Sequence, residues 1–177
     1  MGSTGSAEYG GAEYSGGPQT PATTLGGSLA QNIKKEIVLN LQALVQAGVI
    51  NSVLEIDKGK DVIDIQPDNG YPLALVGMPE ITADFEDQAT NIRTYNFKVL
   101  IAVSYEYLQD KNEGVEYIID QVLNQFDNNF TLKGAAIATV LPMEIVAYPI
   151  ASGDKTLVGI LFPVRARALF QWTNPNP

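Results

Sequence analysis

The 177-residue sequence contains no cysteine and no histidine. These absences exclude disulfides, thiolate nucleophiles, zinc sites built from Cys or His, Ser-His-Asp triads and acid–base catalysis by imidazole. The sequence also lacks an apolar run of 18 residues, so we expect no transmembrane helix. Its N-terminus lacks the basic and apolar regions of a signal peptide, and we expect a soluble protein made in the cytoplasm.

Basic residues are scarce. The chain has 11 Lys and Arg residues against 20 Asp and Glu residues, which gives a net charge of -9. A protein that binds nucleic acid by neutralising phosphates needs the opposite charge. Hydrophobic residues make up 45% of the chain, which is enough for the core of one domain of moderate size. The composition therefore favours a globular domain whose surface repels DNA.

Residues 1–27 are dominated by Gly, Ser, Thr, Ala and Pro. Such a composition buries too little apolar surface to offset the entropy that is lost on ordering. A short repeat places Tyr9 and Tyr14 in two Ala-Glu-Tyr units, and tyrosine is enriched at interface hot spots. We weigh two interpretations equally: an inert leader, and an arm that a neighbouring subunit holds in place. We divide the chain into an N-terminal arm or leader (1–32), an α+β domain (33–172) and a polar C-terminal tail (173–177).

Two segments have the residue spacing of amphipathic helices. Ser28-Leu29-Ala30-Gln31 has the pattern of a capping box and predicts a helix that runs to about Ala47, with Gly48 as its C-terminal glycine. Asp110-Lys111-Asn112-Glu113 is a second capping signal, and it predicts a helix over about 112–127. The apolar stripes of the two helices are Ile33, Ile37, Leu41, Leu44 and Val45, and then Val115, Ile118, Ile119, Val122 and Phe126.

Two segments have the alternation of very long strands. In Ile92–Tyr107, every second residue from Tyr95 is aromatic or β-branched, and the alternation ends in Tyr105 and Tyr107. At about 3.3 Å per residue, this segment would reach roughly 50 Å. Thr156–Trp172 is the second long strand, with apolar residues on one face. A strand longer than the core requires is expected to use part of its length in an interface, so Tyr105 and Tyr107 are candidate interface residues.

Shorter segments complete the predicted sheet. The expected pieces are Ser52–Ile56, Val62–Ile65, a buried strand at Tyr71–Met78, and Ala136–Ile150. Pro142 and Pro149 confine the last of these to a sheet edge or to bulges, and an edge is the better candidate. Ala151 to Lys155 is the expected turn of a hairpin. The prediction is an α+β fold: a mainly antiparallel sheet with long strands, and two amphipathic helices packed on one face.

Carboxylates are the nearest approach to an active site. Pro79–Asn91 is expected to be an acidic loop, in which Asp84, Glu86 and Asp87 are of the residue type that binds a hard cation. Their spacing does not fit the EF-hand calcium loop, and a solvated loop is the favoured interpretation. We therefore expect no catalytic residue, no cofactor and no metal.

Arg165 and Arg167 lie two residues apart in the second long strand, so their side chains share one face of the sheet. Such a pair is suited to carboxylates on a neighbouring strand or across an interface. A solvated sheet face is the more frequent explanation of such a pattern. We retain both arginines as candidate residues for contact with another subunit or a partner.

The order of the elements is similar to that of a known family. The segments that carry the similarity are YPLALVGMPEI, TYNFKVLIAVSYEY, VEYIIDQVLNQF and VRARALFQW, which follow a leading helix. Over residues 33–172, the chain resembles the tail terminator (tail completion) proteins of tailed bacteriophages. The similarity lies in element order and hydrophobic pattern rather than in an invariant motif, and the Gly-rich leader is not a feature of the family.

The resemblance implies a structural virion protein rather than an enzyme. Tail terminators form a ring, usually a hexamer, that caps the tail tube, ends its polymerisation and joins the tail to the neck of the head. The implied partners are copies of the chain itself, the tail tube protein and a head-completion, neck or connector protein. DNA would pass through the lumen without specific binding, and no membrane is involved. The implied location is the tail or neck of the virion, after synthesis in the host cytoplasm.

Three alternatives remain open. The first is another ring subunit of the neck or of the tail tube. The second, from a different class, is a metal-binding α+β enzyme that uses the carboxylates at residues 80–87. The third is a separate binding module that uses the tyrosines of the leader as a recognition tail.

Overall fold

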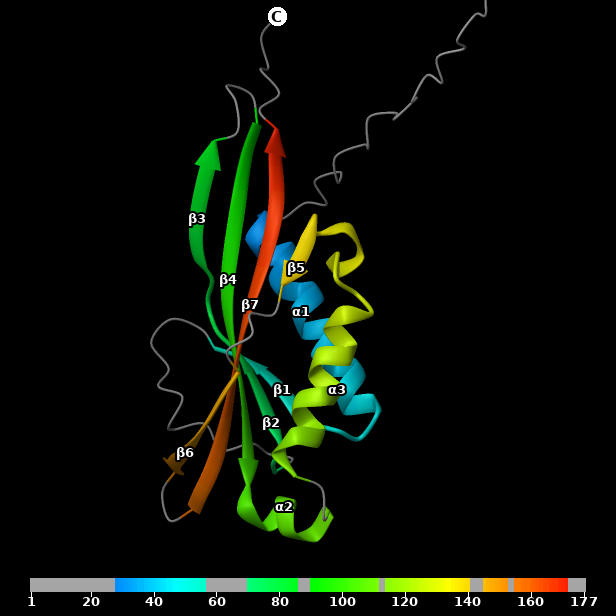
Figure 1. The fold of residues 1–177 in the computed structure, drawn as a ribbon, viewed down its shortest axis with the longest axis vertical. Coiled ribbons are helices and arrows are strands. Elements are labelled where there is room, and N and C mark those ends of the chain that lie inside the picture. Colours follow the sequence, from blue (N-terminus) through cyan, green and yellow to red (C-terminus); the bar gives the residue numbers. More distant parts are fainter. Residues whose placement is uncertain are drawn as a thin grey trace, which may run out of the picture.

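The structure, a computed structural model, describes residues 28–56, 70–85, 90–111, 114–140, 145–152 and 155–171. It has the predicted α+β fold, with one sheet of seven strands, mostly antiparallel, and helices on one side (Figure 1). The helices are α1 (Leu29–Gln46), α2 (Tyr105–Lys111) and α3 (Val115–Asp127), with a short 3-10 helix η2 (Leu132–Gly134). The strands are β1 (Ser52–Glu55), β2 (Leu73–Val76), β3 (Glu80–Phe85), β4 (Thr90–Ser104), β5 (Ala138–Val140), β6 (Val146–Ser152) and β7 (Lys155–Gln171).

The two long strands, β4 and β7, form the antiparallel ladder on which the fold is built. The ladder runs without interruption from the pair Thr90–Gln171 to the pair Ser104–Leu157. β4 has 15 residues, so the ladder spans about 50 Å. The remaining strands add to its sides: the order is β1-β2-β4-β7-β5, while β3 pairs with β4 and β6 pairs with β7. Both predicted long strands are therefore confirmed, apart from the C-terminal end of the first.

The first long strand ends earlier than predicted. Ser104 is its last residue, and Tyr105 begins the helix α2. The Ser104 Oγ accepts a hydrogen bond from the backbone N–H of Tyr107 at 3.2 Å, which is the N-cap interaction of a helix. Alternation alone was thus misleading at Tyr105 and Tyr107, because a serine cap stops the strand just before them.

The first helix forms as its sequence indicates. Ser28 and Gln31 make the reciprocal hydrogen bonds of a capping box, at 3.2 and 3.1 Å. Gly48 has a φ of +73°, and its N–H donates to the carbonyl of Val45 while the N–H of Val49 donates to that of Leu44. These bonds close the helix in a Schellman motif. Because α1 begins at Leu29, the residues from 29 to 32 belong to this helix rather than to the arm.

The second amphipathic helix, α3, starts later than predicted. Its N-cap is Gly114, which makes no side-chain capping bond, and α2 extends through Lys111. The capping signal read at 110–113 was therefore wrong, because its first two residues lie within the preceding helix; Asn112 and Glu113 lie outside the described residues. The predicted stripe is confirmed: Ile118, Val122 and Phe126 are buried, and Val115 and Ile119 pack against the core.

The acidic composition of segment 79–91 predicted a loop, but the structure shows that only part of the segment can be one. Residues 80–85 form β3, which pairs antiparallel with β4 from Glu80–Asn96 to Phe85–Asn91. The prediction was wrong because it relied on the acidic content of the segment and did not take account of the alternation of Ile81, Ala83 and Phe85. Parallel pairing of β1 with β2 was not predicted either. The segments 57–60, 62–65 and 67–69 lie outside the described residues.

The predicted edge segment 136–150 is divided into two strands. β5 pairs with β7 at Arg165–Arg167, and β6 pairs with β7 at Lys155–Leu161. Both lie beside β7 alone among the described strands, so the edge position is confirmed. Ser152 pairs with Lys155, as the predicted hairpin requires.

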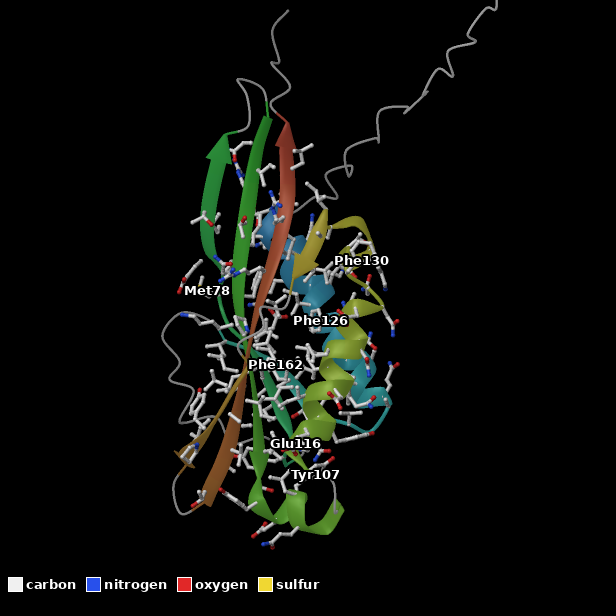
Figure 2. All side chains as sticks on the ribbon, viewed as in Figure 1. Met78, Tyr107, Glu116, Phe126, Phe130 and Phe162 are labelled. Atoms are coloured by element: carbon white, nitrogen blue, oxygen red, sulfur yellow. The ribbon has the colours of Figure 1, made fainter. Side chains whose placement is uncertain are left out.

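The core lies between the sheet and the helices α1 and α3. The alternating residues of β4 from Tyr95 to Val103 are almost fully buried, as are Ile160, Phe162 and Val164 of β7. Figure 2 shows Phe162 at the middle of the molecule, and Phe126 on the side of α3 that faces the sheet. This packing turns the other face of the sheet away from the helices. We call it the helix-free face.

Candidate interaction surfaces

The helix-free face is divided into a polar half and an apolar half along the β4–β7 ladder. In the polar half, Glu80 of β3, Asn96 of β4 and Arg165 of β7 lie in one cross-strand row. The next row contains Thr82, Thr94 and Arg167. This half of the ladder forms one end of the molecule, where β3, β4 and β7 extend past α1 and α3 (Figure 1). We call this three-stranded part (β3, residues 90–96 of β4 and 165–171 of β7) the projecting end.

Arg165 and Arg167 are the cations that the sequence places on one face, and the structure confirms that placement. Both are exposed, and the alternate residues Val164, Ala166 and Ala168 are buried on the helical side. Neither arginine has a carboxylate partner among the described residues, in which the ion pairs are Lys34–Glu55 and Lys98–Glu80. Two adjacent cations on a chain of net charge -9 are thus available to an acidic surface.

Acidic charge is also present at the projecting end. Glu80 lies at the start of β3, and its carboxylate accepts a hydrogen bond from Lys98 at 2.9 Å. Both side chains are more than 60% exposed. Such an exposed ion pair is worth about 0–1 kcal/mol, so it holds Glu80 only weakly. The acid therefore remains accessible to a second cation.

Apolar side chains are also exposed at or next to the projecting end, although Ile81 lies on the face opposite these charges, in the row of Tyr95 and Ala166. Ile81 of β3 is 54% exposed, Met78 just before it is 48% exposed, and Leu169 of β7 is 36% exposed. Figure 2 shows Met78 on the side of the sheet away from α3. Apolar residues at a strand end that projects beyond the core contribute nothing to that core. They are suited to burial by another chain.

The apolar half of the helix-free face carries a row of aliphatic residues across five strands. The row consists of Leu54, Leu75, Leu100, Leu161 and Val146. Leu75 is buried within the row, whereas Leu54 and Val146 are exposed at its two ends. Gly159, in the next row, lies directly under Ile150, so the backbone of β7 comes close to β6 here.

The structure separates the four tyrosines that the sequence proposes for contact. Tyr105 is half exposed at the start of α2. Tyr107 is partly buried against the core, and its hydroxyl donates a hydrogen bond to the carbonyl of Val49 at 3.4 Å. Tyr107 is therefore positioned as a packing residue rather than as a free contact residue. Tyr9 and Tyr14 lie outside the described residues.

The acidic residues considered for a metal are not brought together in the described structure. Asp84 lies within β3, at the register position opposite Ile92. Glu86 and Asp87 lie outside the described residues. Among the residues that the structure does describe, no group of three or more acidic side chains is arranged to hold a metal ion.

Sequence reasoning missed β3 and its exposed residues Ile81 and Met78. The signal was present, because Glu-Ile-Thr-Ala-Asp-Phe alternates polar and apolar residues over the length of an average strand. It also missed Leu169, which lies on the same face as the arginines but is apolar. The projecting end is visible only once β3 is placed beside β4.

Within the described ranges, no helix combines the length and apolar character that crossing a membrane requires. A scan against models of protein families finds no match to this chain, and a search of curated proteins finds no significant similarity.

Proposed function

We propose that the chain is a structural subunit that assembles with its own copies into a closed ring, in the role of a phage tail terminator. The ring would cap the tail tube, end its polymerisation and join the tail to the neck. The observation that carries this proposal is the projecting end, where a three-stranded ribbon extends beyond the helical layer (Figure 1).

Ordering such a ribbon is unfavourable in free energy for a chain that acts alone. The backbone of the ribbon is ordered, which costs roughly 1–2 kcal/mol per residue. Tyr95, Ala166 and Ala168 are buried on its helical side, but Ile81 and Leu169 remain exposed. Burial of apolar surface stabilises by about 25 cal/mol per Å². Contact with a second chain would supply the burial that this end lacks within one chain.

The charge distribution supports the same proposal. Arg165 and Arg167 have no carboxylate partner among the described residues, although acidic residues outnumber basic ones by 20 to 11. Cations of this kind in an acidic protein favour association with an acidic surface, including that of another copy. The overall negative charge would keep DNA from adhering as it passes through a ring.

The element order agrees with the resemblance noted in the sequence. A leading helix, a central pair of long antiparallel strands, a helix after the first of them and a closing hairpin occur in that order. The resemblance supplies the identification with tail terminators. The structure contributes a surface suited to assembly.

The test is the mass of the native assembly, measured by light scattering and native mass spectrometry, with electron micrographs of the same sample. We expect a closed ring, most simply of six subunits, that binds the ends of purified tail tubes. Open tubes of indefinite length would identify a tail-tube subunit instead. A chain that stays monomeric at micromolar concentration and also fails to bind purified tails would contradict the proposal.

A further inference from the structure

The projecting end has two open sheet edges, one on each side. β3 pairs with β4 on one side and with no other strand in the described part of the chain. On the opposite side of the ribbon, β5 ends its pairing at Arg167, but β7 continues to Gln171. Residues 168–171 are thus paired only with β4 among the described strands. Each edge presents unpaired backbone N–H and C=O groups.

Neither edge carries the proline or lysine that protects many free edges, although β3 contains the acidic residues Glu80 and Asp84. Proteins block exposed edges with proline, lysine or very short strands. β6 contains Pro149, and β5 is three residues long. In contrast, β3 has six residues without proline or lysine, and residues 168–171 of β7 contain neither. Among the described strands, the outer edge of β1 is open as well, but only these two edges belong to the projecting end.

We propose that β3 of one copy pairs with residues 168–171 of β7 in the next copy, so that the sheet continues from subunit to subunit. The inference rests on the proposed function, because copies of the chain must assemble. It goes further in naming the two strand edges that meet in the assembly. Because the two edges differ, the contact is heterologous, and repetition of it generates a ring or a helical tube.

The direction of the new strand pair follows from the fold. β3 and β7 are both antiparallel to β4, so they point the same way within one copy. In Figure 1 both arrowheads lie at the projecting end. Rotation about an axis along the strands preserves this direction. The pair between copies is therefore parallel, with evenly spaced hydrogen bonds.

Side-chain faces and charges then select a register. Glu80 and Thr82 share the helix-free face with Arg167 and Leu169. In a parallel pair that continues the sheet, residues on one face must stay on that face. Arg167 is already paired with Ala138 of β5, so the first open position on this face of β7 is Leu169. Placing Glu80 beside Leu169 puts Thr82 beside Gln171, and it leaves Glu80 diagonal to Arg167, within reach of its long side chain. This register brings an acid of one copy near an arginine of the next and covers Leu169.

The absence of natural cysteine permits a direct test by cross-linking, because introduced thiols are the only ones present. Thr82→Cys and Gln171→Cys are prepared as separate variants, mixed in equal amounts, and oxidised mildly. Same-face neighbours on adjacent strands bring their Cβ atoms to about 5 Å, which is within disulfide reach. We expect roughly tenfold more covalent dimer than in a matched mixture of Thr82→Cys with Lys133→Cys, an exposed position on η2.

Each variant alone provides the control for symmetry. A heterologous contact predicts no disulfide in either variant by itself, whereas the double variant Thr82→Cys/Gln171→Cys should give a covalent ladder that ends at the ring size. Light scattering under reducing conditions verifies that the variants still assemble. A short bismaleimide, which spans the diagonal distance of about 7–8 Å, covers a register shifted by two residues.

Three results would overturn the inference. Covalent dimer from Thr82→Cys alone would mean that two β3 strands meet in an isologous contact. Assembly without a covalent product from either reagent would leave the ring in place and remove this edge from it. A wild-type chain that does not assemble, alone or on purified tails, would remove the proposed function and this contact together.

Discussion

The side chain of Asn40 on α1 is joined to that of Gln125 on α3: Asn40 Oδ1 accepts a hydrogen bond from Gln125 Nε2 at 3.1 Å. The same oxygen accepts a second bond from Asn129 at 3.2 Å, and Asn40 Nδ2 donates to the carbonyl of Glu36 at 2.8 Å. Asn40 is only 3% exposed. A buried amide whose bonding groups are satisfied in this way fixes how the two helices lie on the sheet.

Replacing this amide should loosen the helical layer. Asn40→Ala removes one acceptor and one donor and leaves Gln125 of α3 and Asn129, just after α3, without their bond to it. We therefore expect a loss of about 1–3 kcal/mol in unfolding free energy. Urea denaturation measures it. Asn124→Ala, at an exposed position of α3, is the matched control and should stay within about 0.5 kcal/mol of wild type. Equal losses in the two variants would show that the network around Asn40 adds nothing.

Gly48 should be replaceable only at a conformational cost. Its φ is +73°, and a Cβ built there meets no atom within 4 Å. The cost is therefore backbone strain without steric clash. We expect Gly48→Ala to lower the unfolding free energy by about 1 kcal/mol, and Gly48→Asn to lower it by less, because asparagine tolerates the left-handed region better. Thermal unfolding of the two variants is the measurement, and no difference between Ala and wild type would refute it.

Tyr107 and Tyr105 should behave differently despite their proximity in sequence. Tyr107 packs against the core, so Tyr107→Ala should cost about 2–4 kcal/mol of stability. Tyr107→Phe removes only a long hydrogen bond to Val49 and should cost less than about 1 kcal/mol. Tyr105→Ala, at a half-exposed position, should stay within about 0.5 kcal/mol. A large loss from Tyr105→Ala in the isolated chain would contradict its assignment to the surface.

The two arginines of the projecting end should affect assembly rather than folding. In the double variant Arg165→Glu/Arg167→Glu, acids face the acidic strand β3 of the neighbouring copy. We expect the concentration for half-assembly to rise roughly tenfold or more at low salt, and less at high salt, since the contact is electrostatic. Analytical ultracentrifugation gives this concentration.

The control for this variant is Lys35→Glu/Lys133→Glu, which makes the same change in net charge at exposed positions on α1 and η2. It should assemble as wild type does. Equal weakening in both double variants would assign the effect to net charge alone. Unfolding free energies of both variants within about 1 kcal/mol of wild type would verify that the fold is intact.

Local patterns in the sequence were sufficient for much of the fold. The alternation from Tyr95 to Val103 predicted which face of β4 is buried, and the capping box at Ser28 predicted where α1 begins. These predictions succeeded because period and capping depend on residues close together in the chain. The same reasoning failed at Tyr105, where a cap from Ser104 overrides the alternation.

The amino-acid sequence determines the fold class, the two amphipathic helices, the long central strands and the shared face of Arg165 and Arg167, because these follow from spacing along the chain. Tertiary structure adds that β3 lies beside β4, that β5 stops at Arg167, and that two edges of the projecting end are therefore left open. Strand pairing joins residues far apart in sequence, and its register depends on how the whole sheet packs. The surface proposed for assembly is a product of that pairing.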